Sequence, residues 1–159
     1  MFRKVKGKGL KVKVLWLVAK SSTSEIYPES YWRLPKGWLD DEDGGKSPGP
    51  ITRGERKAAE EELQKGALRE VEEEGGVEAK IVKKIGTAPY FRARNTLKFV
   101  TYYLMEWISD LPEGPGFETS EVAWLPFVEA KGRLKYSGEK KILEKAKGVL
   151  DLGIQKNLL

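Results

Sequence analysis

The segment Glu60–Val77, EEELQKGALREVEEEGGV, constrains the fold of this chain more than any other stretch. Successive residues of an α-helix are turned by about 100°, so Glu70, Glu73 and Glu74 lie on one face. Apolar residues recur at helical spacing on the neighbouring face, which is typical of a helix that packs on a core. These residues are Leu63, Ala67, Leu68 and Val71. The sequence therefore predicts a helix with one anchored edge and an adjacent anionic edge.

The carboxylates on this helix repel one another. Like charges at i, i+3 and i+4 destabilise a helix by about 0.2–0.5 kcal/mol per pair. A hard cation such as Mg²⁺ or Mn²⁺ would offset the repulsion, because these ions prefer oxygen ligands. The alternative is a solvated acidic face, which is the usual interpretation of a charge run. The charge run alone leaves both interpretations open.

The composition limits the chemistry that the chain can perform. Its 159 residues include no cysteine and no histidine, which excludes disulfides, thiolate metal sites and serine–histidine triads. Chemistry must rest on carboxylates, Lys, Arg and Tyr. We expect residues 1–159 to form a single domain, because this length supports one core and no linker divides it. No stretch of 18 apolar residues and no signal-peptide pattern occurs, which predicts a soluble, cytoplasmic protein without membrane contact.

The spacing of the acidic helix resembles the Nudix box. Seven residues separate Glu61 from Arg69-Glu70, and Glu73, Glu74, Gly76 and Val77 follow at the positions of that signature. Upstream, the LPKG segment at 34–37 is similar to the one that commonly opens the box. However, 23 residues separate Gly37 from Glu61 where the family has five, which implies an insertion of 18 residues within about 38–60. We interpret the insertion, with its acidic run at 40–43, as a mobile, solvated loop.

The resemblance implies the Nudix fold, an α/β (α+β) architecture in which a mixed β-sheet is sandwiched between α-helices. The hydrophobic pattern is consistent with this and indicates strands separated by turns. We expect strands at 2–5, 11–19, 31–34, 77–85 and 98–107, and a turn-rich segment at 89–94. A further strand near 124, a short helix and a longer C-terminal helix complete the expected order.

The resemblance also implies a metal site. Its ligands would be the box carboxylates Glu70, Glu73 and Glu74, with Glu118 as a further ligand or general base and the carbonyl of Lys36 as another donor. Glu121 is the rival to Glu118. The cofactor would be Mg²⁺, with Mn²⁺ as a substitute. Four residues would support the motif: Gly37, as a tight turn where a Cβ would clash, Gly76, as a left-handed helix stop, and Arg69 and Glu61, which would orient the glutamates.

Substrate contacts follow from the same resemblance, which is strongest to dinucleoside tetraphosphate hydrolases. Lys36 and Lys98 would bind phosphate, although Lys36 taken alone is equally a surface loop lysine. Independently of the resemblance, Tyr90, Phe91 and Tyr136 are aromatic residues near basic ones, so one of them would stack on an adenine ring; the alternative for 89–94 is an ordinary hairpin with exposed arginines. The implied function is Mg²⁺-dependent hydrolysis of a phosphoanhydride bond in a nucleoside diphosphate-linked substrate. The favoured substrate is a dinucleoside polyphosphate such as Ap4A. The alternatives are an RNA 5′-pyrophosphohydrolase, a (d)NTP pyrophosphatase, and a Nudix-like module that binds a nucleotide without turnover.

The charges are unevenly distributed along the chain. Residues 1–20 carry seven basic side chains and no acid, whereas residues 60–78 hold eight Glu against Lys65 and Arg69. Basic groups around an acidic metal site would attract a polyanionic substrate such as a nucleotide polyphosphate or an RNA 5′ end. The alternative is that the N-terminal lysines only keep the domain soluble. No RNA-binding signature appears in the sequence.

Overall fold

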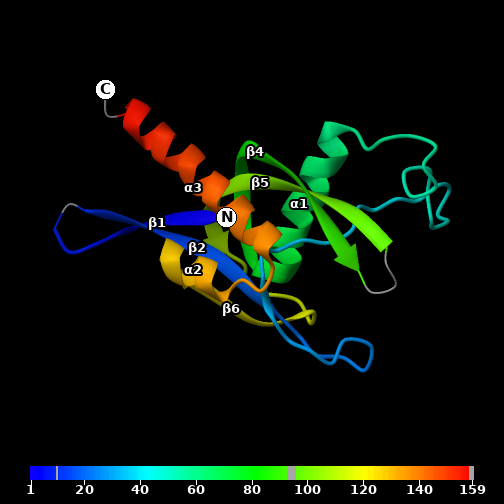
Figure 1. Cartoon of the computed structure of the whole chain (residues 1–159), viewed down its shortest axis with the longest axis horizontal. Coiled ribbons are helices and arrows are strands. Elements are labelled where there is room, and N and C mark those ends of the chain that lie inside the picture. Colours follow the sequence, from blue (N-terminus) through cyan, green and yellow to red (C-terminus); the bar gives the residue numbers. More distant parts are fainter. Residues whose placement is uncertain (10, 93–95, 158–159) are drawn as a thin grey trace.

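The computed structural model describes residues 1–9, 11–92 and 96–157, without the side chains of 90–92, 96 and 157. This part of the chain forms six strands and three helices (Figure 1). In chain order they are β1 (Phe2–Lys6), β2 (Val12–Ser21), β3 (Trp32–Arg33), α1 (Glu60–Gly75), β4 (Val77–Arg92), β5 (Thr96–Asp110), β6 (Thr119–Leu125), α2 (Phe127–Arg133) and α3 (Ser137–Asn157).

The strands form one mixed sheet in the order β3-β2-β1-β5-β4, with β6 paired to β2 outside this path. β1 and β5 are parallel at the pair Phe2 and Glu106, and the other pairings are antiparallel. The predicted mixed sheet is confirmed. Strand β2 pairs with β1, β3 and β6, so the apolar run that the sequence placed in the core lies on an interior strand of the sheet.

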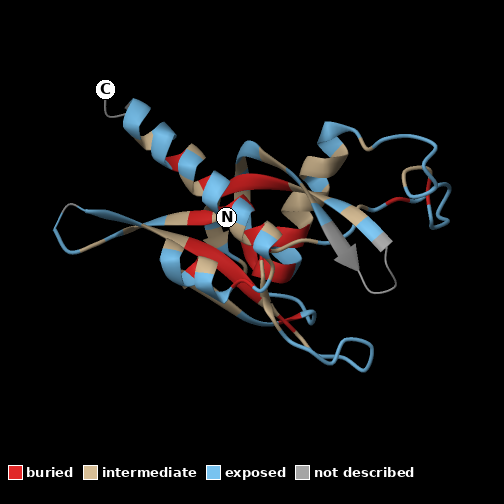
Figure 2. Cartoon of the chain, in the orientation of Figure 1, coloured by how far each residue is buried: buried red, intermediate tan, exposed pale blue. Residues whose placement is uncertain are grey.

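Alternation along β2 separates two apolar clusters on the two faces of the sheet. Trp16 and Val18 pack in one cluster with Leu143 of α3, whereas Leu17 packs in the other with Val71 of α1. Burial is accordingly concentrated along β2, β5 and the inner sides of the helices (Figure 2). The sandwich of a sheet between helices is therefore confirmed, and the apolar edge of α1 is anchored as predicted.

Helix α1 ends where the sequence predicted. Gly76 caps it with a left-handed φ of 65°, and its N–H donates to the Glu72 carbonyl at 3.0 Å. A Cβ at this position would lie 2.5 Å from the Pro115 nitrogen. The glycine is thus required both by the backbone conformation and by the close approach of the 114–115 turn.

Two sequence expectations are corrected. The strand expected at 77–85 continues to Arg92. The described part of 89–94, which was expected to be rich in turns, is therefore paired β-structure.

The insertion is not a uniformly solvated loop. Asp41 is buried, and its carboxylate accepts N–H bonds from Ile51 at 3.1 Å and Thr52 at 2.5 Å. These bonds satisfy its oxygens and join the beginning of the insertion to its middle.

None of the helices in the described residues has the length and apolar character needed to cross a membrane.

Candidate active site

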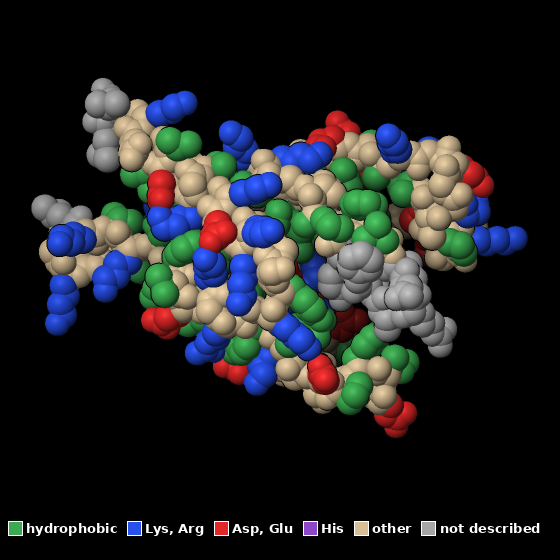
Figure 3. All heavy atoms as spheres, in the orientation of Figure 1, with side chains coloured by type: hydrophobic (Ala, Val, Ile, Leu, Met, Phe, Trp, Pro, Cys, Tyr) green, Lys and Arg blue, Asp and Glu red, His purple; other side chains and the backbone are tan. Residues whose placement is uncertain are grey.

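A cleft of about 1260 Å³ lies between α1, the loop after β3, β5 and the start of α3. Three of the four candidate catalytic carboxylates line it, namely Glu70, Glu74 and Glu118. Glu73 is not among the lining residues. A hollow with acidic side chains in its depth is visible in the space-filling view (Figure 3). The cleft therefore brings together α1 carboxylates and a residue from the turn before β6.

Burial differs sharply among the three box carboxylates. Glu70 and Glu74 are 8% and 3% exposed, whereas the Glu73 side chain is 55% exposed. Helix periodicity placed all three on one face, but α1 docks so that this face straddles the edge of the cleft. Glu73 lies on the solvent side of that edge.

Arginines pair with each of these carboxylates. Arg33 of β3 forms an ion pair with Glu74, and the Arg69 guanidinium lies 2.8 Å from both Glu70 Oε1 and Glu73 Oε2. Helical spacing offers Glu74 no basic residue at i+4, where Glu78 stands, and the repulsion among the carboxylates pointed to a cation as their partner. That inference was incomplete, because Arg33 comes from a strand 41 residues earlier.

The electrostatics of the cleft disfavour full ionisation. Burial raises the pKa of Glu70 to about 7, and the charges of Glu74, Glu73 and Glu118 add to the rise while Arg69 opposes it. Burial also raises the pKa of Glu74, against the opposing effects of Arg33 and Lys36. A bound cation would relieve this crowding, since it favours the ionised form of every carboxylate near it.

The loop after β3 is fitted closely to these carboxylates. The backbone N–H of Lys36 donates to Glu74 Oε2 at 2.8 Å. A Cβ added at Gly37 would overlap the carboxylate of Glu70, which is the clash expected of this glycine. The LPKG segment therefore packs directly against the carboxylate layer.

The side chain of Lys36 points into the protein. Its Nζ lies 2.7 Å from Glu139 Oε1, and the two side chains are 8% and 4% exposed. The same carboxylate oxygen accepts the N–H of Leu34 at 3.2 Å. Glu139, in the first turn of α3, thus holds the loop from the side opposite to Glu74. Sequence reasoning missed Glu139 because no local pattern links two residues 103 positions apart.

The remaining phosphate and base candidates are only partly described. Lys98 lines the cleft and its ammonium lies over the ring of Trp38. Tyr136 also lines the cleft and meets Tyr31 edge to face, with ring centroids 5.4 Å apart. Tyr90 and Phe91 belong to β4, but their side chains lie outside the described part of the structure. Tyr136 is therefore the only one of the three aromatic candidates whose side chain is described.

The two rivals for the fourth carboxylate lie in different places. Glu118 lines the cleft, and its charge raises the pKa of both Glu70 and Glu74. Glu121 lies on β6 with its carboxylate 3.9 Å from Lys20. Glu61 is exposed in the first turn of α1. The geometry favours Glu118 over Glu121.

The insertion is seated on α1 beside the cleft. Arg69 donates to the carbonyl of Trp38 at 2.5 Å and lies 3.4 Å from Asp40. Leu39 covers Gly66, where an added Cβ would be 2.9 Å from Leu39 Cδ2. The small residue at 66 therefore makes room for the insertion, which supplies part of the cleft wall.

The chemistry of these donors fits a divalent cation. Carboxylate oxygens are the ligands that Mg²⁺ prefers, and the pKa of Glu70 is raised chiefly by burial, with smaller contributions from the neighbouring carboxylates. In the described part of the chain, no three acidic side chains are already gathered into a ready metal site. The ion pairs with Arg33 and Arg69 would have to rearrange when a cation binds.

Comparisons with known proteins identify the family and the fold. The NUDIX domain family model matches residues 7–146. The protein MutT4 of Mycobacterium tuberculosis is 28% identical over 123 residues, which cover 76% of this chain and 42% of MutT4. The chain thus spans less than half the length of that relative.

Solved structures share the fold. The Ap4A hydrolase of C. elegans, in a binary complex, superposes with a TM-score of 0.60 at 21% identity and covers 94% of this chain and 92% of its own. A NUDIX hydrolase from Nitrosomonas europaea gives a TM-score of 0.57 at 16% identity, with coverages of 92% and 86%.

Proposed function

The chain belongs to the NUDIX domain family and is a hydrolase, and from this premise we propose that it cleaves a phosphoanhydride bond of a dinucleoside polyphosphate such as Ap4A in the presence of Mg²⁺. Members of the family generally use divalent cations. The whole of residues 1–159 would act as one catalytic domain.

One observation carries the proposal. Glu70 and Glu74 are buried at the base of a cleft that also contains Glu118 and Lys98. Burying carboxylates beside one another is unfavourable unless opposite charges neutralise them, and here Arg33 and Arg69 supply two such charges for Glu70, Glu74 and the nearby Glu118. A cleft with an acidic base and basic residues on its walls suits a polyphosphate that is bridged to the carboxylates by a cation.

The residues of the cleft would have different catalytic roles. Glu70, Glu73 and Glu74 would hold the cation, with Glu118 as a further ligand or as the base that accepts a proton from the attacking water. Glu73 would bind the cation from the solvent side of the three carboxylates. Arg69 would orient Glu70 and Glu73, and Lys98 would bind a phosphate oxygen. When bound, the cation neutralises phosphate charge and supports water attack.

Base recognition would lie at the mouth of the cleft. Tyr136 forms an edge-to-face pair with Tyr31. The Nζ of Lys135 lies 5.0 Å from the ring centroid of Tyr31 and 5.8 Å from that of Tyr136. The two rings are nearly perpendicular, so the face of one ring rather than the pair as a whole would stack on an adenine, next to the positive charge of Lys135. Tyr136→Ala should raise KM more than it lowers kcat.

The test is hydrolysis of diadenosine polyphosphates, NTPs, ADP-ribose and 5′-triphosphorylated RNA with and without Mg²⁺, followed by chromatographic separation of the products, which for Ap4A would be ATP and AMP. We expect the highest kcat/KM with a diadenosine polyphosphate and no turnover without the metal. Glu73→Gln and Glu74→Gln should lower kcat by about 10²-fold or more, since a metal supplies several kcal/mol of transition-state stabilisation.

The matched control is Glu72→Gln on the same helix. Glu72 is exposed and is not a lining residue of the cleft. Its replacement removes the same charge from α1 and should leave turnover unchanged. Full activity of both Glu73→Gln and Glu74→Gln would reject the proposed site, and preferential cleavage of NTPs would reject the proposed substrate.

A further inference from the structure

The positive charge of this protein is concentrated in two segments that are distant in sequence. Residues 1–24 contain seven basic and no acidic side chains, and residues 127–159 contain eight basic against four acidic. The two segments thus carry +7 and +4 of a chain whose net charge is +5, which leaves −6 on residues 25–126.

The fold joins these two segments. Phe2 and Trp16, from β1 and β2, pack in the same apolar cluster as Ile142 and Leu143 of α3. The base of the β1–β2 hairpin therefore packs against α3. This packing brings the two basic segments near each other, although they are separated by more than 100 residues in the sequence.

The outer part of the hairpin projects from the body of the protein (Figure 1). Phe2 is buried at its base, whereas Lys6, Lys8, Lys11 and Lys13 are exposed near its tip. A strand of five residues is about 17 Å long at roughly 3.3 Å per residue, so the lysines lie well away from the core.

The hairpin lysines are not neutralised by the protein. In the described part of the chain, Lys6, Lys8, Lys11 and Lys13 form no ion pair with a carboxylate, whereas Lys4, nearer the base, is 3.8 Å from Glu106. An acid-free stretch that ends in an exposed hairpin keeps its full positive potential. Such a surface favours a polyanion.

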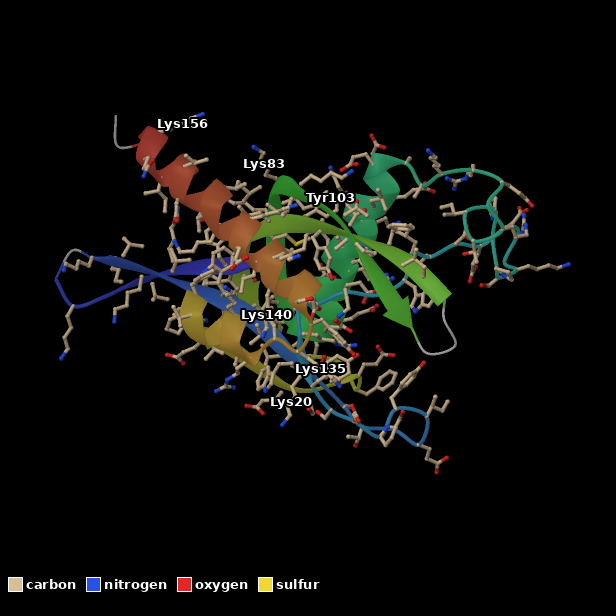
Figure 4. The ribbon with its side chains drawn as sticks, viewed as in Figure 1. Lys20, Lys83, Tyr103, Lys135, Lys140 and Lys156 are labelled. Atoms are coloured by element: carbon tan, nitrogen blue, oxygen red, sulfur yellow. The ribbon has the colours of Figure 1, made fainter. Side chains whose placement is uncertain are left out.

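Further basic residues connect the hairpin with the cleft. Lys and Arg side chains spread from the hairpin across the centre of the face shown in Figure 3. Lys140 lies at the centre of this face and Lys135 lies below it, on the way from α3 to the cleft (Figure 4). Lys135 is itself a lining residue of the cleft, where its ammonium is ion-paired with Glu29 at 2.8 Å. The basic surface thus reaches the mouth of the site.

From this arrangement we propose that the β1–β2 hairpin and the adjoining surface of α3 form a binding surface for the phosphate backbone of single-stranded RNA. Lys6, Lys8, Lys11 and Lys13 supply the charge at the far end of the surface. The ligand is longer than any dinucleotide, because a molecule confined to the cleft would not reach the hairpin tip.

Aromatic groups at the cleft end favour a single strand over a duplex. Tyr31 and Tyr136 flank Lys135 there, and Tyr27 and Phe117 are 46% and 90% exposed on the cleft wall. Unpaired bases stack on exposed aromatic rings while basic groups follow the backbone. A base-paired duplex keeps its bases stacked internally and gains nothing from these rings.

Fluorescence anisotropy with a labelled, 5′-hydroxyl RNA of mixed sequence tests the surface. This RNA has no phosphoanhydride bond, so the result does not depend on the proposed hydrolysis. In the test variant, four lysines become glutamine: Lys6, Lys8, Lys11 and Lys13. We expect its RNA affinity to fall by about tenfold or more. The slope of log K against log salt concentration should decrease by about 3, at roughly 0.7 per lost phosphate contact.

The control variant loses the same charge elsewhere. It replaces four lysines that are also exposed and form no ion pair, outside the two basic segments: Lys46, Lys57, Lys65 and Lys83. It should keep the affinity of the wild type within about twofold. Both variants should melt cooperatively near the wild-type Tm and hydrolyse the preferred small nucleotide at the wild-type kcat.

Three outcomes would overturn the proposal. The first is an equal loss of affinity in both variants, which would assign binding to net charge alone. The second is the absence of salt-dependent RNA binding by the wild type. The third is binding to vesicles with anionic lipids but not to RNA, which would identify the hairpin as a membrane contact.

Discussion

Replacing Glu70 by Gln should stabilise the metal-free protein, and the gain should increase with pH. Glu70 is 8% exposed and its pKa is raised to about 7, chiefly by burial. Gln has a similar shape and stays neutral, so it imitates the protonated carboxyl group. The variant therefore removes the cost of holding an ionised carboxylate in the cleft.

The size and sign of the effect follow from linkage between protonation and folding. Between the ordinary pKa of 4.5 and the raised value of about 7, the folded wild type binds more protons than the unfolded chain. The contribution of Glu70 to stability is therefore present below about pH 4.5 and is lost as the pH rises towards 7. At about 1.36 kcal/mol per pH unit, the difference between Gln and wild type should grow by about 2–3 kcal/mol from pH 5 to pH 8.

The measurement is thermal unfolding and urea unfolding of both proteins in EDTA at pH 5 and pH 8. For a chain of this size, the extra stability at pH 8 corresponds to a rise in Tm of roughly 5–10 °C. Addition of Mg²⁺ at pH 8 should then reduce the difference, because a cation that binds only the folded state stabilises the wild type more.

The control is Glu73→Gln, on the same helix with a side chain that is 55% exposed. An exposed ion pair contributes little, so this variant should differ from the wild type by less than about 1 kcal/mol at both pH values. A Glu70→Gln effect that is the same at pH 5 and pH 8 would refute the account of the cleft as a site of crowded, buried charge.

Two further predictions concern the loop after β3. Gly37→Ala should reduce kcat by about tenfold or more and cost about 1–3 kcal/mol, because its Cβ would overlap the carboxylate of Glu70. In the control Gly132→Ala, the added Cβ meets no atom within 4 Å, and urea unfolding should show no loss; equal losses would contradict the packing argument. Glu139→Ala should cost about 3–5 kcal/mol, since it removes the buried carboxylate that pairs with the ammonium group of Lys36. The double variant Glu139→Leu/Lys36→Met should recover most of this stability in urea unfolding, and additive losses would disprove the pairing.

Local patterns in the sequence determined the parts of this protein that depend on neighbouring residues. Helix α1, its anchored edge and its left-handed stop at Gly76 were all predictable, because a period of 3.6 residues and a glycine after the last turn encode them directly. The position of the insertion followed from the displaced LPKG segment. The resemblance supplied the mixed sheet, and alternating apolar residues located most of its strands.

Only the tertiary structure decided how the carboxylates are neutralised and supported. Arg33 reaches Glu74 from a strand, Glu139 reaches Lys36 from the last helix, and Asp41 is buried by bonds within the insertion. The structure also separated Glu118, in the cleft, from Glu121 beside Lys20. Each of these contacts joins elements whose relative placement follows from the packing of the whole sheet. A local sequence pattern contains no information on which distant residues meet in space. The sequence therefore predicted the acidic helix but not the residues that hold it in place.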